Sequence, residues 1–454
     1  NGGARHSNDY SSGEGEILNS QSRTETTKIG ATYVTDRFHL GASYGYNNLL
    51  YGIPLASPDA DEVITLAMRR NAINFDGAVN DLGIFQRLRF NGTRVNYAHD
   101  ERNHDEVDTT FKNDTFETRV LLDQEPYKRL TGTIGFWGLH GHTSALGEEI
   151  LAPNTTQNTF SGFAFEELAF GANKVQFGGR MEHTGYNPEP LPDREPFEDR
   201  NFTGFSGSTG IVHSFNNNTV LAVNYALAYR APGIEELYNH GPHDGTLAFE
   251  IGDPNLKREL GNNIDSSLRY QSNRLQGELD GFYARLQDFV FLAPTGEIDA
   301  GSGFPIAIYS QANARFTGYE ATLNIAVTNA IWLKVGSDYV NAELTDTGTP
   351  VPRIPPFRNR FGVEWRHSNL SLQPEFIIVS SQHRVFTNET PTDGYKIFNL
   401  RSSYTWNAGN CRHSITAALT NATNKFYINH VSFIKDRAPE QGRSFKVTYA
   451  LSFF

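Results

Sequence analysis

Alternation of apolar and polar residues over short segments is the main pattern in this chain. In segment 221–229, Leu221, Val223, Tyr225, Leu227 and Tyr229 are separated by single Ala or Asn residues. Segment 445–453 repeats this period up to the end of the chain. Successive side chains of a β-strand point to opposite faces, so each such segment is predicted to be a strand with one apolar face. A soluble β-sandwich would explain one or two of these segments, but the pattern recurs along the whole chain.

The alternation predicts about nineteen strands. They span residues 24–35, 38–49, 63–76, 84–99, 107–123, 127–141, 156–169, 173–186, 198–214, 218–230, 259–271, 274–292, 306–327, 331–344, 357–367, 370–383, 395–406, 412–421 and 441–454.

The connections between these strands alternate between short and long. The short ones are rich in Asn, Asp and Gly, which suit tight hairpin turns. The long ones are 50–62, 100–106, 142–155, 187–197, 231–258, 293–305, 345–356, 384–394 and 422–440. All long loops therefore emerge on one side, as in outer-membrane barrels with short periplasmic turns and long extracellular loops. The sequence predicts an all-β fold, a transmembrane antiparallel β-barrel whose C-terminus lies on the short-turn side.

Composition agrees with this fold and excludes several others. The 454 residues are only 38% hydrophobic and contain no run of 18 apolar residues, which excludes a transmembrane helix. Aromatic residues make up 12%, which argues against disorder. The net charge is −12 without a basic stripe, so nucleic acid is not expected as a partner. The single cysteine, Cys411, excludes an internal disulfide framework.

The odd strand count suggests that part of the barrel is missing. Single-chain bacterial barrels have even numbers of strands. Residues 1–23 are polar and rich in Gly and Ser, and we interpret them as the tail of an extracellular loop whose preceding strands are absent. Residues 24–454 then form an N-terminally truncated barrel domain.

Several stretches resemble the TonB-dependent outer-membrane receptors. The strongest are Tyr229–Tyr238 (YRAPGIEELY) and Gly252–Glu259 (GDPNLKRE), supported by Pro352–Pro356, Leu419–Asn424, Ser432–Asp436 and Ala438–Arg443. The resemblance spans essentially the whole chain. It implies a bacterial outer-membrane receptor with about 22 strands around a plug domain, of which about 19 strands are visible here and the plug is absent. It also implies outer-membrane lipid, a small metal ligand and the TonB–ExbB–ExbD energy-coupling complex as partners, the last through the missing N-terminal part.

Histidine and carboxylate residues near the long loops are the candidate chemistry, because no catalytic constellation occurs and an enzyme is not expected. Imidazole with carboxylate suits zinc or a similar divalent ion. His140 and His142 are two apart on a strand and so share a face. The alternative is that all of these are solvated loop residues. The candidate metal residues are His99, His104, His140, His142, His240, His243, Asp244, Glu148 and Glu149, with Asp100 and Asp105 as auxiliary oxygens.

The resemblance implies uptake of a scarce nutrient. The histidine-rich loops resemble those of the zinc-uptake subgroup, so a divalent zinc-like ion or a metal complex is the first choice. A ferric siderophore is the alternative, and a passive porin-like channel is the alternative from another class. No cofactor is required, and zinc or another divalent metal would be a substrate.

Overall fold

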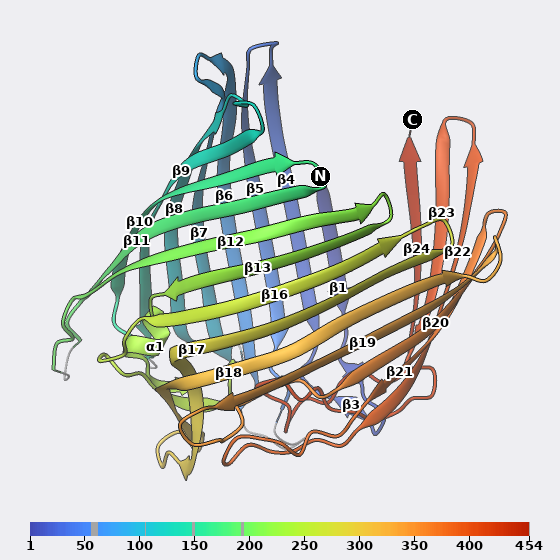
Figure 1. Ribbon diagram of the computed structural model, residues 1–454. Coiled ribbons are helices and arrows are strands. Elements are labelled where there is room, and N and C mark those ends of the chain that lie inside the picture. Colours follow the sequence, from blue (N-terminus) through green and yellow to red (C-terminus); the bar gives the residue numbers. More distant parts are fainter. Residues whose placement is uncertain (56–61, 105, 148–149, 192–194, 454) are drawn as a thin grey trace.

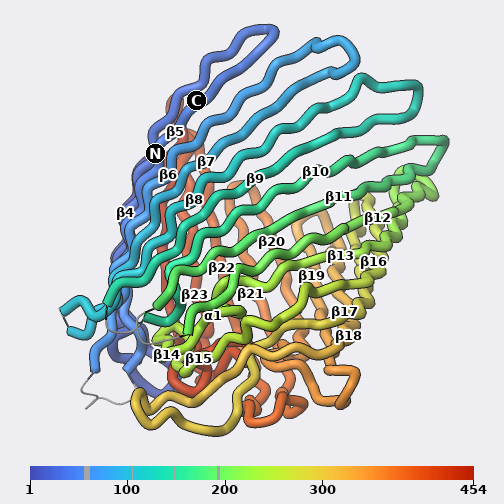
Figure 2. The backbone as a smooth tube through the Cα atoms, turned by 90° about the vertical axis from the view of Figure 1, so that its left-hand side faces the viewer, coloured from blue at the N-terminus to red at the C-terminus, as the bar shows by residue number. Residues whose placement is uncertain are grey.

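The chain forms one large curved sheet around a central lumen (Figures 1 and 2). The computed structural model describes residues 1–55, 62–104, 106–147, 150–191 and 195–453. Short turns join the strands at the upper and right-hand side of Figure 1, called here the turn end. Longer loops join them at the lower and left-hand side, called the loop end. In the described residues there is one helix, α1 (Ile234–Tyr238), and no helix is long and apolar enough to cross a membrane.

Nineteen strands of the described residues make the wall, and each pairs in antiparallel register with the next one, with β13 pairing with β16. Before the helix they are β4 (Ser22–Val34), β5 (Phe38–Gly52), β6 (Ile64–Leu82), β7 (Phe85–Asn103), β8 (Glu106–Gln124), β9 (Leu130–Gly147), β10 (Thr155–Phe170), β11 (Asn173–Pro188), β12 (Arg200–Asn216) and β13 (Thr219–Arg230). After it they are β16 (Glu259–Gln271), β17 (Leu275–Ile298), β18 (Pro305–Ala326), β19 (Ile331–Leu344), β20 (Arg358–His367), β21 (Leu370–Val379), β22 (Tyr395–Ala408), β23 (Cys411–Thr420) and β24 (Ser444–Phe453). The short strands are β1 (Gly2–Ser7), β2 (Tyr10–Ser11), β3 (Glu16–Ile17), β14 (His240–His243) and β15 (Ala248–Ile251).

The wall strands confirm the predicted all-β barrel architecture. Three segments outside the predicted strands differ from the prediction. The predicted long loop 100–106 is largely taken up by strands, because β7 continues to Asn103 and β8 already begins at Glu106. Segment 1–23 contains β1, which pairs with β4, and segment 231–258 contains α1, β14 and β15. The ends of the strands beyond the apolar band carry polar residues on both faces. The alternation of apolar and polar residues therefore does not show where a strand ends.

The apolar faces of the wall strands lie outside, as predicted. Val223 and Tyr225 are exposed on β13, while Asn224 between them lies on the opposite face, beside Asp265 of β16. In β24 every second residue from Phe445 to Phe453 is an exposed hydrophobic one. Tyr229 is an exception to the prediction: its side chain packs against the buried cluster around α1 and lies against Gly204.

The wall is open between its first and last strands. Register pairs join β1 to β4 and β23 to β24, and among the described residues no register pair joins β24 to β1 or β4. Figure 1 shows these two edges standing apart. The end of β24 lies at the turn end, as the alternation of connections predicted.

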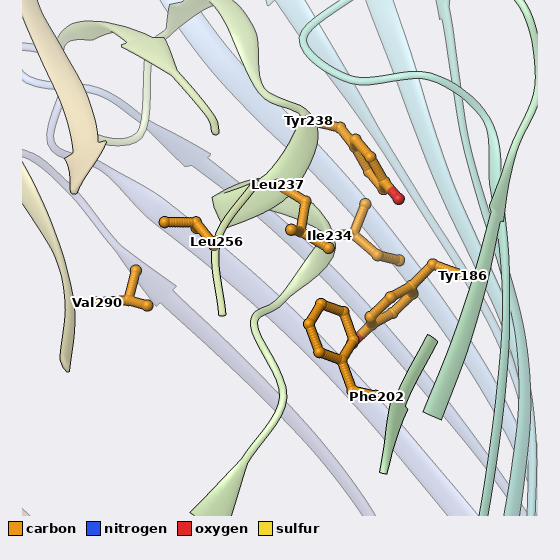
Figure 3. Packing of buried hydrophobic residues seen from close by; sticks show 7 residues of the cluster. All are labelled: Tyr186, Phe202, Ile234, Leu237, Tyr238, Leu256 and Val290. Carbon is orange, nitrogen blue, oxygen red and sulfur yellow. The ribbon is translucent and has the colours of Figure 1, made fainter. Parts of the chain in front are cut away.

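Helix α1 packs against the inner side of the wall at the loop end (Figure 3). Its buried residues Ile234, Leu237 and Tyr238 pack against Tyr186 of β11 and Phe202 of β12. The Tyr186 hydroxyl donates a 2.9 Å hydrogen bond to the Pro232 carbonyl, immediately before the helix. These contacts hold segment 231–258 in one place, so the hairpin β14–β15 that follows is also fixed.

Arg230 ties the start of this segment to the wall. Its guanidinium donates two hydrogen bonds of 2.6 Å to the Glu259 carboxylate, one to each oxygen. It also donates to Glu236, whose carboxylate accepts the backbone N–H of Gly233 at 2.8 Å. A bidentate Arg–carboxylate pair is among the strongest polar contacts in proteins. The stretch that carries the sequence resemblance is therefore the stretch that anchors α1.

Candidate ligand site at the loop end

Glu250 of the β14–β15 hairpin is the centre of a buried polar cluster. The carboxylate is 1% exposed and lies 3.0 Å from His243 Nδ1. It also accepts hydrogen bonds from Asn239 at 2.7 Å, Thr246 at 2.7 Å and the Tyr309 hydroxyl at 3.3 Å. Each carboxylate oxygen has two partners, so Glu250 is satisfied within the protein.

His243 and Glu250 shift each other's pKa in opposite directions. Burial would lower the pKa of His243, but the hydrogen bond to Glu250 and the carboxylates of Glu250, Glu101 and Asp244 outweigh it and raise that pKa above its ordinary value. Burial would raise the pKa of Glu250, but the hydrogen bond and charge of His243 hold it below its ordinary value. A protonated imidazole cannot bind a metal ion, so the raised pKa of His243 works against its use as a metal ligand.

Glu389 is the centre of a second buried cluster, which joins three loops. Its carboxylate is 3.0 Å from Lys435 Nζ and 3.2 Å from His430 Nε2, and it accepts the backbone N–H groups of Arg353 and Phe386. Burial would raise its pKa, but the contacts with His430 and Lys435 outweigh it and lower the pKa to about 2. Loops 345–357, 380–394 and 421–443 thus share one ionised carboxylate.

A pocket of about 520 Å³ lies between the hairpin and these loops. Three basic side chains line it, Arg353, Lys435 and Arg437, together with apolar residues that include Leu292, Ile306 and Phe433. Two carboxylates also reach it: Glu389, bound to Lys435, and Asp436, which accepts a 3.0 Å hydrogen bond from the Thr390 hydroxyl.

Arg353 lies between the two buried clusters. Burial lowers its pKa, against the charges of Glu389, Tyr309 and Glu250. The guanidinium carbon is 3.9 Å from the centre of the Phe433 ring, a cation–π contact. Burial also lowers the pKa of Arg437, opposed by Asp244 and Glu62. Both guanidinium groups have lost hydration, so the pocket is suited to a ligand that brings negative charge to them.

The residues predicted to bind metal lie on several separate surfaces of the protein. His99 is on the inner face of β7, stacked on Phe111 at 4.8 Å and 3.8 Å from Glu101. His104 is exposed directly after β7, where its Nδ1 lies 3.0 Å from Asn103 Oδ1. His240 packs edge-on against Phe249 of the same hairpin as His243 and Asp244.

His140 and His142 share a face of β9, as predicted, but it is the outer one. They have the parity of the exposed Ile134 and Phe136, and their Nδ1 atoms lie 2.8 Å from Asn158 Oδ1 and 3.2 Å from Thr156 Oγ1. Asp100 is on the outer wall too, whereas Glu148, Glu149 and Asp105 lie outside the described residues. Within the described ranges no group of three or more His, Cys, Asp or Glu residues could hold a metal ion.

The sequence reasoning missed Glu250, Glu389, Arg353, Lys435 and Arg437. A signal was present, because Arg353, Lys435 and Glu250 occur in or beside the stretches that carry the family resemblance. Charged residues in such stretches deserved the same weight as the histidines.

Comparison with known proteins identifies the family. A family model described as "TonB dependent receptor-like, beta-barrel" matches residues 1–424. The chain belongs to the TonB-dependent receptors. The family and the matched structures are outer-membrane receptors and transporters, not enzymes.

Solved structures of this receptor family have the same fold. The copper transporter OprC superposes with a TM-score of 0.86 at 16% identity, over 100% of this chain and 75% of that one. The FrpB iron transporter from Neisseria meningitidis gives 0.77 at 12% identity, over 99% of this chain and 76% of its own. The Serratia marcescens hemophore receptor HasR gives 0.75 at 14% identity, over 99% and 74%. At these identities the likeness concerns the fold alone.

Proposed function

We propose that this receptor takes up a scarce metal as a negatively charged complex, which binds in the 520 Å³ pocket at the loop end. The observation that carries the proposal is the convergence of Arg353, Lys435 and Arg437 on one partly apolar pocket. Anions gain charge-assisted hydrogen bonds from such groups, and the apolar wall suits the organic part of a chelator. A metal is a substrate here, not a cofactor.

A bare divalent ion is the second candidate. The OprC copper transporter supports it through its fold, and the loop histidines supply suitable ligand types. Against it stand the raised pKa of His243 and the lack of a three-residue metal group in the described ranges. The FrpB iron transporter and the ferric citrate transporter FecA show that the same fold serves iron in other proteins. These observations favour the ferric-complex alternative over a free zinc-like ion.

We also propose that the complete protein closes the seam with further strands and holds a plug in the lumen. The open edges of β1 and β24 and the 75% coverage of OprC support this. Closure removes exposed strand edges, which are prone to mispairing. In such a protein, coupling to TonB–ExbB–ExbD would run through the part that carries the plug. A plug would also exclude the alternative class, a passive porin-like channel.

The full-length receptor tests the ligand proposal with ferric dicitrate as a negatively charged metal complex and zinc chloride as the cation alone. Isothermal titration is expected to show saturable binding of ferric dicitrate, weakened about tenfold or more in Arg353→Gln/Arg437→Gln, which removes two charged contacts. Arg366→Gln on β20 is the matched control, because its guanidinium pairs with Glu364 and it faces the turn end of the lumen.

Two outcomes contradict the anionic-complex proposal. One is ferric dicitrate binding that is equal in wild type and the double variant. The other is tight zinc binding without any ferric dicitrate binding, which would favour the divalent-ion candidate.

A further inference from the structure

A cluster of cations covers the outer wall of β6, β7 and β8 near the loop end; the three strands lie side by side in Figure 2. Arg69 of β6 is in register with Ala98 of β7, which is in register with Lys112 of β8. Neighbouring strands are about 4.8 Å apart, so the Cα atoms of Arg69 and Lys112 are about 10 Å apart, on either side of a small residue. Lys112 is exposed, and the Arg69 side chain is 59% exposed.

Asp100 orients two of the arginines in this cluster. Its Oδ2 lies 3.2 Å from Arg102 Nη2 and 3.7 Å from Arg69 Nη2, and its Oδ1 accepts a 2.9 Å hydrogen bond from the Thr110 hydroxyl. The Asp100 side chain is only 10% exposed. The Nε–H of Arg102 is buried and has no hydrogen-bond partner among the described residues. Asp100 therefore lies between Arg102 and Arg69 and restricts where their guanidinium groups can lie.

The cluster borders the apolar band of the wall. Arg94 lies in register between Ile73 and Phe116, two exposed hydrophobic residues, and it has the same outward parity as Ala98. Counting it, the outer face of these register rows has four cations, Arg69, Arg94, Arg102 and Lys112. The carboxylates there are Asp100, already bound to two arginines, and Asp114, which accepts a 2.6 Å hydrogen bond from Asn96.

This position is where a membrane surface begins. A charged residue is costly at the centre of the lipid-facing band and tolerated near its edges, so Arg94 marks the level of the headgroups. Long loops are extracellular in barrels of this kind, so these are the headgroups of the outer leaflet. The whole chain has a net charge of −12, so the positive charge of this part of the outer wall is opposite in sign to that of the chain.

We propose that this cluster binds the phosphate groups of a phosphorylated glycolipid in the outer leaflet. Arginine donors form paired, charge-assisted hydrogen bonds with phosphate, and basic pockets on membrane proteins bind anionic headgroups for this reason. The small residue Ala98 lies between Arg69 and Lys112 in register, so no large side chain separates the two cations. The proposal depends on the outer-membrane location of the wall and is independent of the cargo.

The full-length receptor, exchanged into phosphatidylcholine nanodiscs, tests this. Lipid A, a glucosamine disaccharide with two phosphates, is the probe, and native mass spectrometry counts the copies bound per protein. Wild type is expected to retain it in preference to its dephosphorylated form. The triple variant Arg69→Gln/Arg102→Gln/Lys112→Gln should retain about tenfold less, because each surface cation contributes to anionic-lipid binding.

Arg23→Gln is the matched control, since Arg23 has the same outward parity at the loop end and its charge is paired with Glu25 at 2.6 Å. This control should retain lipid A as wild type does. Equal retention of lipid A by wild type and the triple variant would overturn the proposal. So would equal retention of the phosphorylated and dephosphorylated forms by wild type, a comparison that needs no variant to fold. Displacement of lipid A by millimolar inorganic phosphate would also overturn it, in favour of a free-phosphate site.

Discussion

Glu389 and Lys435 form an ion pair of 3.0 Å although their side chains are only 6% and 5% exposed. Taking two charges out of water is unfavourable unless further hydrogen bonds satisfy them. Glu389 meets this condition, because His430 and two backbone N–H groups also reach its carboxylate. The pair fastens loop 380–394 to loop 421–443 next to the candidate ligand pocket.

The Glu389 cluster should weaken in acid. The pKa of Glu389 in the folded protein is about 2, below the ordinary value of 4.5. A lowered folded pKa means that the stabilisation is complete above pH ~4.5 and is lost as the pH falls toward 2, by roughly 3 kcal/mol in total. Pepsin digestion between pH 4.5 and 2 should therefore cut the two loops faster at the lower pH. Equal cutting, after normalisation to a short unstructured peptide, would contradict this.

Removing one partner of the pair should loosen the same loops at neutral pH. Lys435→Met leaves a buried carboxylate short of a cation, which costs about 3 kcal/mol or more, and adding Glu389→Gln should recover most of it. Limited trypsin digestion in the two loops measures this. Lys174→Met is the control, because Lys174 forms an exposed pair with Glu167 and its loss should cost less than about 1 kcal/mol. A double variant as labile as Lys435→Met would argue against charge burial as the cause.

The barrel wall was predictable from sequence because every wall strand repeats the same physical constraint. Lipid on one side and the lumen on the other require alternation, and Asn- and Gly-rich turns separate the strands. The side of the wall taken by His140 was predictable as well, since the parity that places Phe136 outside also places His140 outside. The strand that carries His140 was correctly predicted. The prediction nevertheless grouped His140 and His142 with the residues of the long loops as metal ligands.

The loop-end clusters could not be predicted in this way. Glu389 and Lys435 are 46 residues apart, in segments without periodicity, and only the packing of three loops brings them together. The orientation of Tyr229 could not be predicted from the pattern either. Tyr229 continues the alternation of β13, but its side chain packs against the buried cluster around α1. Tertiary packing overrides strand parity where a loop folds back onto the wall.

The lipid-facing assignment of β13 predicts an asymmetric response to charge. Val223→Arg puts a guanidinium on the outer wall and should cost about 2–4 kcal/mol near the membrane midplane. Asn224→Arg on the inner face should cost far less, because it lies beside Asp265 and faces the lumen. Urea unfolding of both variants in lipid vesicles provides the comparison. Similar unfolding midpoints for the two would mean that the faces are assigned wrongly.

The proposed closure of the seam predicts hydrogen-exchange protection at both open edges in the complete protein. Alternate backbone N–H groups of β24 point away from β23, and no strand accepts them among the described residues. If preceding strands fill the seam, these amides of Ser444–Phe453 should exchange as slowly as those bonded to β23. Mass-spectrometric exchange with single-residue fragmentation measures this. Fast exchange at every second residue in the full-length protein would show that the seam stays open.

Zinc affinity should depend on the histidines at the loop end and not on those of the outer wall. His240→Ala/His243→Gln should reduce zinc affinity by about tenfold or more if a divalent ion binds at the loops, whereas His140→Ala/His142→Ala should leave it unchanged. Gln at position 243 keeps a donor for the buried Glu250, so the hairpin remains folded. Only a neutral imidazole binds metal, and the pKa of His243 is raised, so zinc binding should begin to fail at a pH above the ordinary imidazole value of about 6.5 as the medium is acidified. Zinc titrations of both double variants between pH 8 and 6 test this prediction. An unchanged zinc affinity in the loop variant would mean that His240 and His243 are structural residues. Arg353 and Arg437 would then be the groups that select the cargo.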